Sequence, residues 1–293
     1  MESHTIINEI KKSNHLPQMP KSIGDVFTMV LNPEEFEVDH FICKVTDHPK
    51  LESLLIQYLN SPYFRLNREI ENIRDAIIYL GINNVKLIVI SFITRLLLPD
   101  KKGRTKTFNH NTYWKHCIGT SIASFMIAEY TGISDKQKMF TYGLIHDIGI
   151  TVLDICLPEH LDKIHELQLK GLHQIAAEKI VLGGKTHADI GMWLCKEWGL
   201  PIEIAEVVGF HHGPTLSKEN VDEVKLLYLA DSISTNYYER LLGNDKTFTY
   251  SDKIMKAIGV TKEQIDTIIK RLPKEIEKVN RVVNFEPIDE EKE

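Results

Sequence analysis

The spacing of apolar residues is the feature that most constrains the fold, because it repeats every three or four positions along most of the chain. Leu51, Leu54, Leu55, Tyr58 and Leu59 form one such stripe. This spacing places apolar side chains on one face of an α-helix, whereas a half-buried strand would alternate them. The apolar runs show no convincing alternation and are not joined by Asn-Gly or Asp-Gly hairpin turns. The sequence therefore predicts an all-α protein.

Proline, glycine and capping residues divide this pattern into separate helices. Proline disfavours helix at the preceding residue, and glycine commonly follows the last helical residue. Thr186 and Asp189 stand at capping-box spacing. These signals predict helices at residues 5–13, 21–31, 34–46, 49–59, 70–80, 83–98, 111–130, 135–147, 158–169, 172–182, 186–198, 201–212, 221–242, 251–258 and 262–279.

A short polar segment divides the chain. Residues 99–107 are basic and are interpreted as a solvated linker, although their lysines could also contact a phosphate or an acidic partner. Residues 286–293 are acidic and are expected to fray. We therefore expect an N-terminal helical part at residues 1–102, a helical core at 108–243, and C-terminal helices with an acidic tail at 244–293.

Charge and hydropathy argue against a nucleic-acid-binding, membrane or secreted protein. The net charge of -6 argues against bulk binding of nucleic acid or of an anionic membrane. The most apolar run, Leu87 to Leu98, contains Arg95 and is too short to span a bilayer, so a buried helix is expected. No secretory signal is apparent, which favours a cytoplasmic protein. Four cysteines without a C-x-x-C pair are expected to be buried, reduced thiols: Cys43, Cys117, Cys156 and Cys195.

Histidine and aspartate form the pattern H…HD…H…HH…D in the second half of the chain. Each residue also has a plainer interpretation, such as a core histidine, a helix cap or a solvent-facing helix end. The candidate metal ligands are His116, His146, Asp147, His187, His211, His212 and Asp231. The remaining histidines are interpreted as surface or capping residues: His4, His15, His40, His48, His110, His160, His165 and His173.

The two aspartates carry the argument for a metal ion. Asp147 follows the apolar helix end Gly143-Leu144-Ile145-His146, and Asp231 stands among apolar residues in Leu226–Ile233. Burying an unpaired polar group costs about 2–7 kcal/mol, and an ionised one costs more. Each carboxylate therefore needs a cation or several donors, unless the histidines and aspartates merely satisfy one another. Imidazole and carboxylate ligands together suit iron, manganese, zinc, nickel or cobalt, and seven candidates allow one or two ions.

The motifs around these residues resemble a known family. Gly143–Gly149 is similar to the HD motif of the HD superfamily of metal-dependent phosphohydrolases. Residues 47–49, 60–64, 182–191 and 198–212 resemble the HDOD domain, an all-α relative in bacterial signalling, and the resemblance covers roughly residues 14 to 240. It implies an HD-type helical bundle with an N-terminal helical subdomain.

The resemblance also implies roles for the candidate ligands. His116, His146, Asp147 and Asp231 match the ligand set of mononuclear members. His187, His211 and His212 match the additional ligands of binuclear members, notably the HD-GYP cyclic-di-GMP phosphodiesterases. Ile150 stands where HD-GYP proteins usually have lysine, and Gly213-Pro214 replaces their Gly-Tyr-Pro signature. These departures argue against cyclic-di-GMP as the substrate.

Two functions follow as hypotheses. One is a metal-dependent phosphohydrolase, a phosphodiesterase or phosphomonoesterase, in which His146 and Asp147 form the catalytic centre for a phosphorylated small molecule or nucleotide. Lys185, or residues 101–104, would supply positive charge to the phosphate. The other is a non-catalytic signalling module that binds metal and docks a protein partner or nucleotide.

Overall fold

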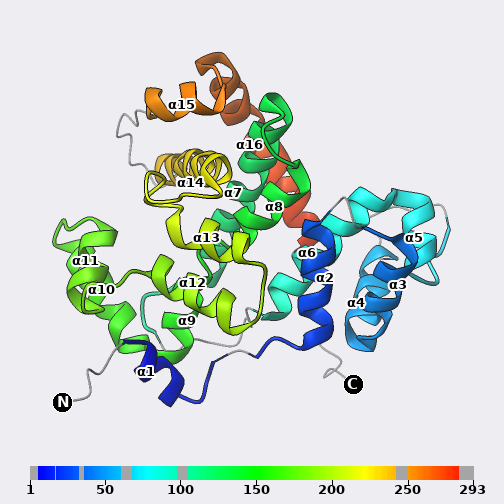
Figure 1. The fold of residues 1–293 in the computed structure, drawn as a ribbon, viewed down its shortest axis with the longest axis horizontal. Coiled ribbons are helices and arrows are strands. Elements are labelled where there is room, and N and C mark those ends of the chain that lie inside the picture. Colours follow the sequence, from blue (N-terminus) through cyan, green and yellow to red (C-terminus); the bar gives the residue numbers. More distant parts are fainter. Residues whose placement is uncertain are drawn as a thin grey trace.

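The computed structural model describes residues 6–16, 18–32, 36–60, 68–97, 105–241 and 250–283. Every regular element in these ranges is a helix, which confirms the all-α prediction (Figure 1). The first half contains α1 (Ile6–Lys12), α2 (Lys21–Leu31), α3 (Val38–Thr46), α4 (Pro49–Leu59), α5 (Ile73–Leu80) and α6 (Ile82–Leu97). The second half contains α7 (His110–Thr131), α8 (Lys136–Ile145), α9 (Ile148–Cys156), α10 (Pro158–Leu169), α11 (Gln174–Val181), α12 (His187–Glu197), α13 (Ile202–Phe210), α14 (Val221–Leu241), α15 (Asp252–Ile258) and α16 (Lys262–Val283).

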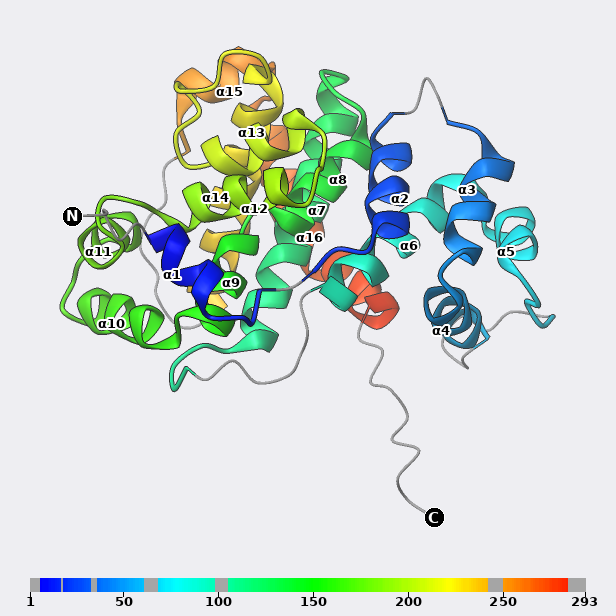
Figure 2. The same cartoon turned by 60° about the horizontal axis from the view of Figure 1, so that its bottom comes forward.

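The helices of the first half lie in two places. Helices α2 to α5 form one end of the molecule, and α6 joins them to α8 and α16 (Figures 1 and 2). Helix α1 instead lies beside α9, and Lys11 Nζ is 2.9 Å from Glu197 Oε1 of α12. The chain between α1 and α2 therefore crosses the face of the molecule (Figure 2), and Pro20 at its end is extended. The expected linker overlaps residues 98–104, which lie outside the described residues, as does the acidic tail.

Glycines bring the central helices close together. Helix α7 packs against α8, α14 and α16. A side chain at Gly143 of α8 would overlap the backbone of Ser121 in α7, and one at Gly119 would overlap Ser234 of α14. This contact holds the end of α8, where His146 lies, against the helix that carries His116.

One helix was missed. The helix predicted at 135–147 corresponds to α8, which ends at Ile145, but the sequence predicted no helix at residues 148–156, where α9 runs from Ile148 to Cys156. The error arose because both helices are buried, so their residues show no amphipathic stripe. The segment Lys136–Cys156 is apolar and long enough to cross a membrane by composition, but it is broken at His146-Asp147 and 89% of its apolar window is buried. It forms part of the core of the fold.

The cysteine prediction was wrong at one position. Cys117, Cys156 and Cys195 are buried and free, as expected, but Cys43 is exposed. It lies on the outer side of α3, whose inner side buries Phe41 and Val45. Hydrophobic neighbours in sequence do not share one face of a helix, which explains the error.

Candidate metal centre

The structure brings all seven predicted residues together. Five come from helix ends: His146 closes α8, Asp147 opens α9, His187 begins α12, and His211 and His212 follow α13. His116 and Asp231 lie within α7 and α14.

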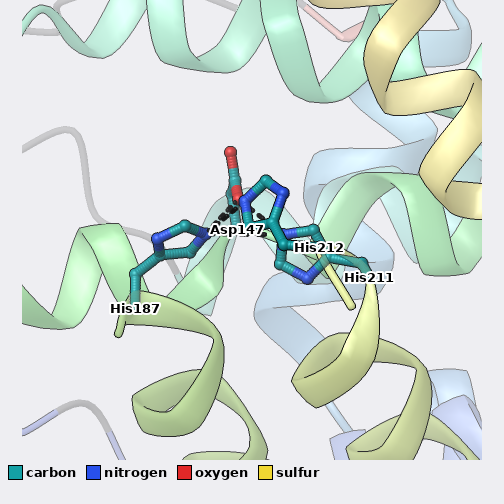
Figure 3. A group of neighbouring side chains, drawn as sticks. All are labelled: Asp147, His187, His211 and His212. Carbon is teal, nitrogen blue, oxygen red and sulfur yellow. Dashed lines mark hydrogen bonds and ion pairs between the residues drawn. The ribbon is translucent and has the colours of Figure 1, made fainter. Parts of the chain in front are cut away.

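Four of the residues form one group, which we call the His187 cluster: Asp147, His187, His211 and His212 (Figure 3). Asp147 Oδ1 lies 3.1 Å from His187 Nε2 and 3.4 Å from His211 Nε2. His187 Nε2 is also 3.4 Å from His211 Nε2 and 3.1 Å from His212 Nε2. The potential ligand atoms therefore face one shared point.

The other three residues, His116, His146 and Asp231, form the His116 cluster. His116 Nε2 is 3.2 Å from both His146 Nε2 and Asp231 Oδ1. The second carboxylate oxygen of Asp147, Oδ2, lies 3.3 Å from His146 Nε2 and 3.5 Å from His116 Nε2. Asp147 thus turns one oxygen to each cluster and joins them.

These separations fit a metal site. Ligands about 2.0–2.1 Å from one zinc-like ion lie about 2.9–3.4 Å from each other in tetrahedral or octahedral geometry. Most of the nitrogen and oxygen distances in both clusters fall at or near this range. Mutual hydrogen bonding alone is a poorer explanation, because several close pairs are Nε2 to Nε2 and each such pair can share only one proton. The buried histidines and aspartates could therefore bind metal.

The far side of two imidazole rings is held by hydrogen bonds to backbone carbonyl groups. His146 Nδ1 is 2.8 Å from the carbonyl oxygen of Gly143, and His211 Nδ1 is 2.6 Å from that of Val208. A carbonyl only accepts, so each Nδ1 must donate its proton. In the neutral ring each Nε2 then keeps its lone pair toward the cluster, which is the tautomer that a metal ligand needs.

At Asp147 and His146, the charges and hydrogen bonds of neighbouring residues shift the pKa in the direction opposite to that caused by burial. Burial raises the pKa of Asp147, but the charge of His146 and hydrogen bonds from the histidines hold it well below its usual value. Burial lowers the pKa of His146, yet Asp147 and Asp231 outweigh this and raise it to about 10. Burial, together with the charges of His211 and His187, lowers the pKa of His212 to about 2. The aspartates thus hold protons on some histidines, and a cation would have to displace those protons.

Glu178 is a functional candidate that the sequence did not reveal. It is buried in α11, and its Oε1 lies 2.7 Å from His187 Nδ1. Its Oε2 accepts from the backbone N–H of His187 at 2.9 Å. Gln174 Nε2 donates to Glu178 Oε1 at 2.9 Å. A lone glutamate in a helix gives no sequence signal for such a role, because only tertiary packing brings it to His187.

Replacing Glu178 by glutamine should weaken metal binding at the His187 cluster. The amide can present a donor where His187 Nδ1–H needs an acceptor, so the ring loses its orientation. Loss of such a supporting contact typically costs about 10–100-fold in metal affinity. Competition with a chelator of known affinity would measure the change. Glu206→Gln is the matched control, since Glu206 accepts one hydrogen bond from Asn220 away from the site. Equal metal affinity in Glu178→Gln and the parent would contradict the assigned role.

Both clusters open into a cavity of about 720 Å³. His116, Asp147, His212 and Asp231 line one side of it. Residues of α10 and α11 also line the cavity, as do His165 and His173, which were predicted to lie at the surface or to cap helices. His173 does cap α11, since its Nδ1 accepts the N–H of Ile175. The size suits a small organic ligand.

One of the predicted phosphate-binding residues, Lys185, is not found at this cavity. Lys185 is exposed, lies 3.5 Å from Asp189, and is not among the residues that line the cavity. Residues 101–104 lie outside the described residues. Within the part of the chain that the structure describes, the cavity lining holds no lysine or arginine.

The fold and the site define a helical protein with a buried histidine and aspartate cluster beside a cavity. Residues 16–214 match the model of the HDOD domain, so the chain belongs to the HDOD family. The match includes six of the seven site residues and ends before Asp231. It confirms the resemblance seen in the sequence.

Solved structures share the fold at low sequence identity. An HDOD domain protein of unknown function from Geobacter sulfurreducens superposes with a TM-score of 0.73, at 19% identity, over 96% of this chain and 100% of that one. A protein from Shewanella amazonensis SB2B, described as a proposed phosphohydrolase, gives a TM-score of 0.70 at 20% identity, over 95% of this chain and 99% of that one.

A relative is also found by sequence alone. An uncharacterized protein of Treponema pallidum (strain Nichols) is 23% identical over 201 residues, which are 67% of this chain and 37% of that protein. This chain therefore matches little more than a third of that relative's length.

Proposed function

We propose that this protein is a metal-dependent phosphohydrolase that acts on a phosphoester, such as that of a nucleotide, in the cytoplasm. The observation that carries the proposal is Asp147, whose two carboxylate oxygens each face a separate group of histidines. The proposed phosphohydrolase from Shewanella amazonensis supports the assignment through its shared fold. The cavity beside both clusters provides room for a substrate.

Each cluster would hold one divalent ion of iron, manganese, zinc, nickel or cobalt. Ions bound there would polarise a phosphoryl oxygen and lower the pKa of a water molecule. Asp147 would join the two sites, while His187, His211 and His212 would complete one and His116, His146 and Asp231 the other. Carbonyl oxygens of Gly143 and Val208 and the carboxylate of Glu178 orient the rings. His212 has 32% of its side chain exposed, so this side of the site faces the cavity and is open to a substrate.

A second candidate function is a non-catalytic signalling module. Its support is the HDOD family itself and the fold of a proposed signal transduction protein from Marinobacter aquaeolei VT8, with a TM-score of 0.76 at 17% identity, over 96% of this chain and 62% of that one. In this case residues 108–243 would bind metal, and helices of residues 1–102 would dock a protein partner or nucleotide. The absence of turnover in fully metal-loaded protein would favour this candidate.

The two candidates share an expected effect of metal on stability. Binding of an ion to the folded chain at a concentration one hundred times its Kd should stabilise it by about 2.7 kcal/mol per site. Thermal unfolding with manganese, zinc or a chelator would measure this gain, and metal analysis of protein purified without a histidine tag would count the ions. No bound ion and no metal-dependent stabilisation would contradict both functions.

Hydrolysis separates the candidates. Manganese-loaded protein should release phosphate or alcohol from at least one member of a panel of phosphomonoesters, phosphodiesters and nucleotides. The chelated protein is the control, because it keeps the same chain and any contaminating phosphatase that does not need the metal. Turnover that survives chelation would not belong to the proposed site.

A further inference from the structure

One face of α10 lines the cavity, and the proposed function does not yet use it. Its members stand at positions i, i+3, i+4 and i+7 of the helix, so they share one side of it. We call them the α10 stripe: Leu161, Ile164, His165 and Gln168. The stripe combines two aliphatic side chains with an imidazole and an amide. It therefore presents a wall of mixed apolar and polar character to a molecule in the cavity.

The cavity also follows α7 away from the metal centre. His116, Tyr113 and Asn109 all line it, and Asn109 caps the first turn of α7. From Asn109 to His116 the helix rises about 10 Å, at about 1.5 Å per residue. The cavity is thus long enough to hold a phosphoryl group at the metal centre and an organic group beyond it.

Phe108 adds an aromatic ring to the wall of the cavity. The segment that carries it is bonded to α10, because the backbone N–H of Lys106 donates to Asp162 Oδ1 at 3.1 Å and Thr107 Oγ1 donates to the same oxygen at 2.8 Å. Asp162 directly follows Leu161. These bonds bring the aromatic ring and the start of the α10 stripe to the same part of the cavity.

The two polar members of the stripe are accessible to a ligand. The side chains of His165 and Gln168 are partly exposed and form no hydrogen bond or ion pair with the residues that the structure describes. The other glutamine of the cavity, Gln174, is already occupied, since it donates to Glu178 Oε1 at 2.9 Å. An amide group both donates and accepts. A molecule that pairs fully with Gln168 must therefore offer an acceptor and a donor side by side.

We propose that the α10 stripe and Phe108 bind the base of a nucleoside phosphoester whose phosphoryl group lies at the metal centre, and that Gln168 hydrogen-bonds the edge of that base. Nucleobases have apolar faces, which stack on aromatic or apolar side chains, and an edge of donors and acceptors, which polar side chains recognise. An aliphatic group would leave Gln168 and His165 unpaired, whereas a sugar alone would leave the apolar side chains uncovered. This inference rests on the proposed function, because it takes the ligand of the metal centre to be a phosphoester.

Gln168→Leu tests the inference in the full chain loaded with manganese. The probes are adenosine, cytidine, guanosine and uridine and, separately, inorganic phosphate; as products of the proposed reaction they are not hydrolysed by it. At least one nucleoside should bind to the parent in isothermal titration. Gln168→Leu should weaken that binding about tenfold, because the base loses its hydrogen bonds. Phosphate affinity and metal content should not change.

Two further variants make the test specific. Gln168→Glu keeps nearly the same shape but replaces the amide donor by a second acceptor, so it should change the order in which the four nucleosides bind. Gln57→Leu is the matched control, since Gln57 is exposed on α4 and does not line the cavity. Its affinity for every probe should equal that of the parent.

The outcomes separate this inference from the proposed function. A parent protein that binds phosphate but none of the nucleosides would overturn the inference and leave the phosphohydrolase proposal standing. Parental nucleoside affinity in Gln168→Leu, with an unchanged order in Gln168→Glu, would also overturn it. Equal losses of nucleoside and phosphate affinity in Gln168→Leu would contradict a role confined to the base. Metal-loaded parent protein that binds no phosphate would overturn both proposals.

Discussion

Alanine at Asp147 should remove metal from both clusters and reduce phosphoester hydrolysis to background. Asp147 supplies Oδ1 to the His187 cluster and Oδ2 to the His116 cluster, so one substitution takes a ligand from each. It also removes the negative charge that offsets the repulsion between two cations. Metal analysis of untagged protein would measure the loss, and circular dichroism would check that the helices remain.

Asp231→Ala provides the comparison for this prediction. Asp231 Oδ1 faces His116 Nε2 at 3.2 Å, whereas its Oδ2 lies 3.7 Å from Nδ1 of His212 in the His187 cluster. Its loss should therefore weaken the His116 cluster and leave an ion at the His187 cluster. An Asp147→Ala protein that keeps its full metal content would refute the proposed site, and equal effects of the two substitutions would refute the bridging role.

Alanine at Gly149 should destabilise the protein by about 2–3 kcal/mol, a typical cost of overpacking a tight core. Gly149 lies in the first turn of α9, where a Cβ atom would overlap the backbone carbonyl of His187 at the start of α12. Backbone cannot move aside as a side chain can, so α9 and α12 must separate. His187 would then shift from Asp147, and metal affinity should fall with stability. Chemical denaturation with and without metal would measure both effects.

Gly209→Ala separates this packing effect from the general effect of alanine in a helix. Gly209 is in α13, and its added Cβ would meet the flexible side chain of Met192 rather than backbone. Alanine also favours helix over glycine by about 0.5–1 kcal/mol, which would offset part of the crowding. Gly209→Ala should therefore change stability by less than about 1 kcal/mol and leave metal affinity unchanged. A Gly149→Ala protein as stable as Gly209→Ala would contradict the close contact between α9 and α12.

Local signals in the sequence predicted most of the helices. The capping box of Thr186 and Asp189 is present at the start of α12, and Asn72 and Asp135 also cap helices with their side chains. Prediction failed where burial removed the amphipathic pattern, as at α9, for which no helix was predicted. It failed also at Cys43, where neighbours in sequence point in different directions.

The sequence by itself determined the helical class, the HDOD family and the seven residues that meet in the site, because periodicity, caps and motifs are local properties. Only the tertiary structure decided how those residues divide into two clusters and that Asp147 joins them. It alone also brought Glu178 to His187 and placed Tyr113, His165 and His173 at the cavity. Distances between residues on different helices depend on how those helices pack, and local sequence carries no measure of that.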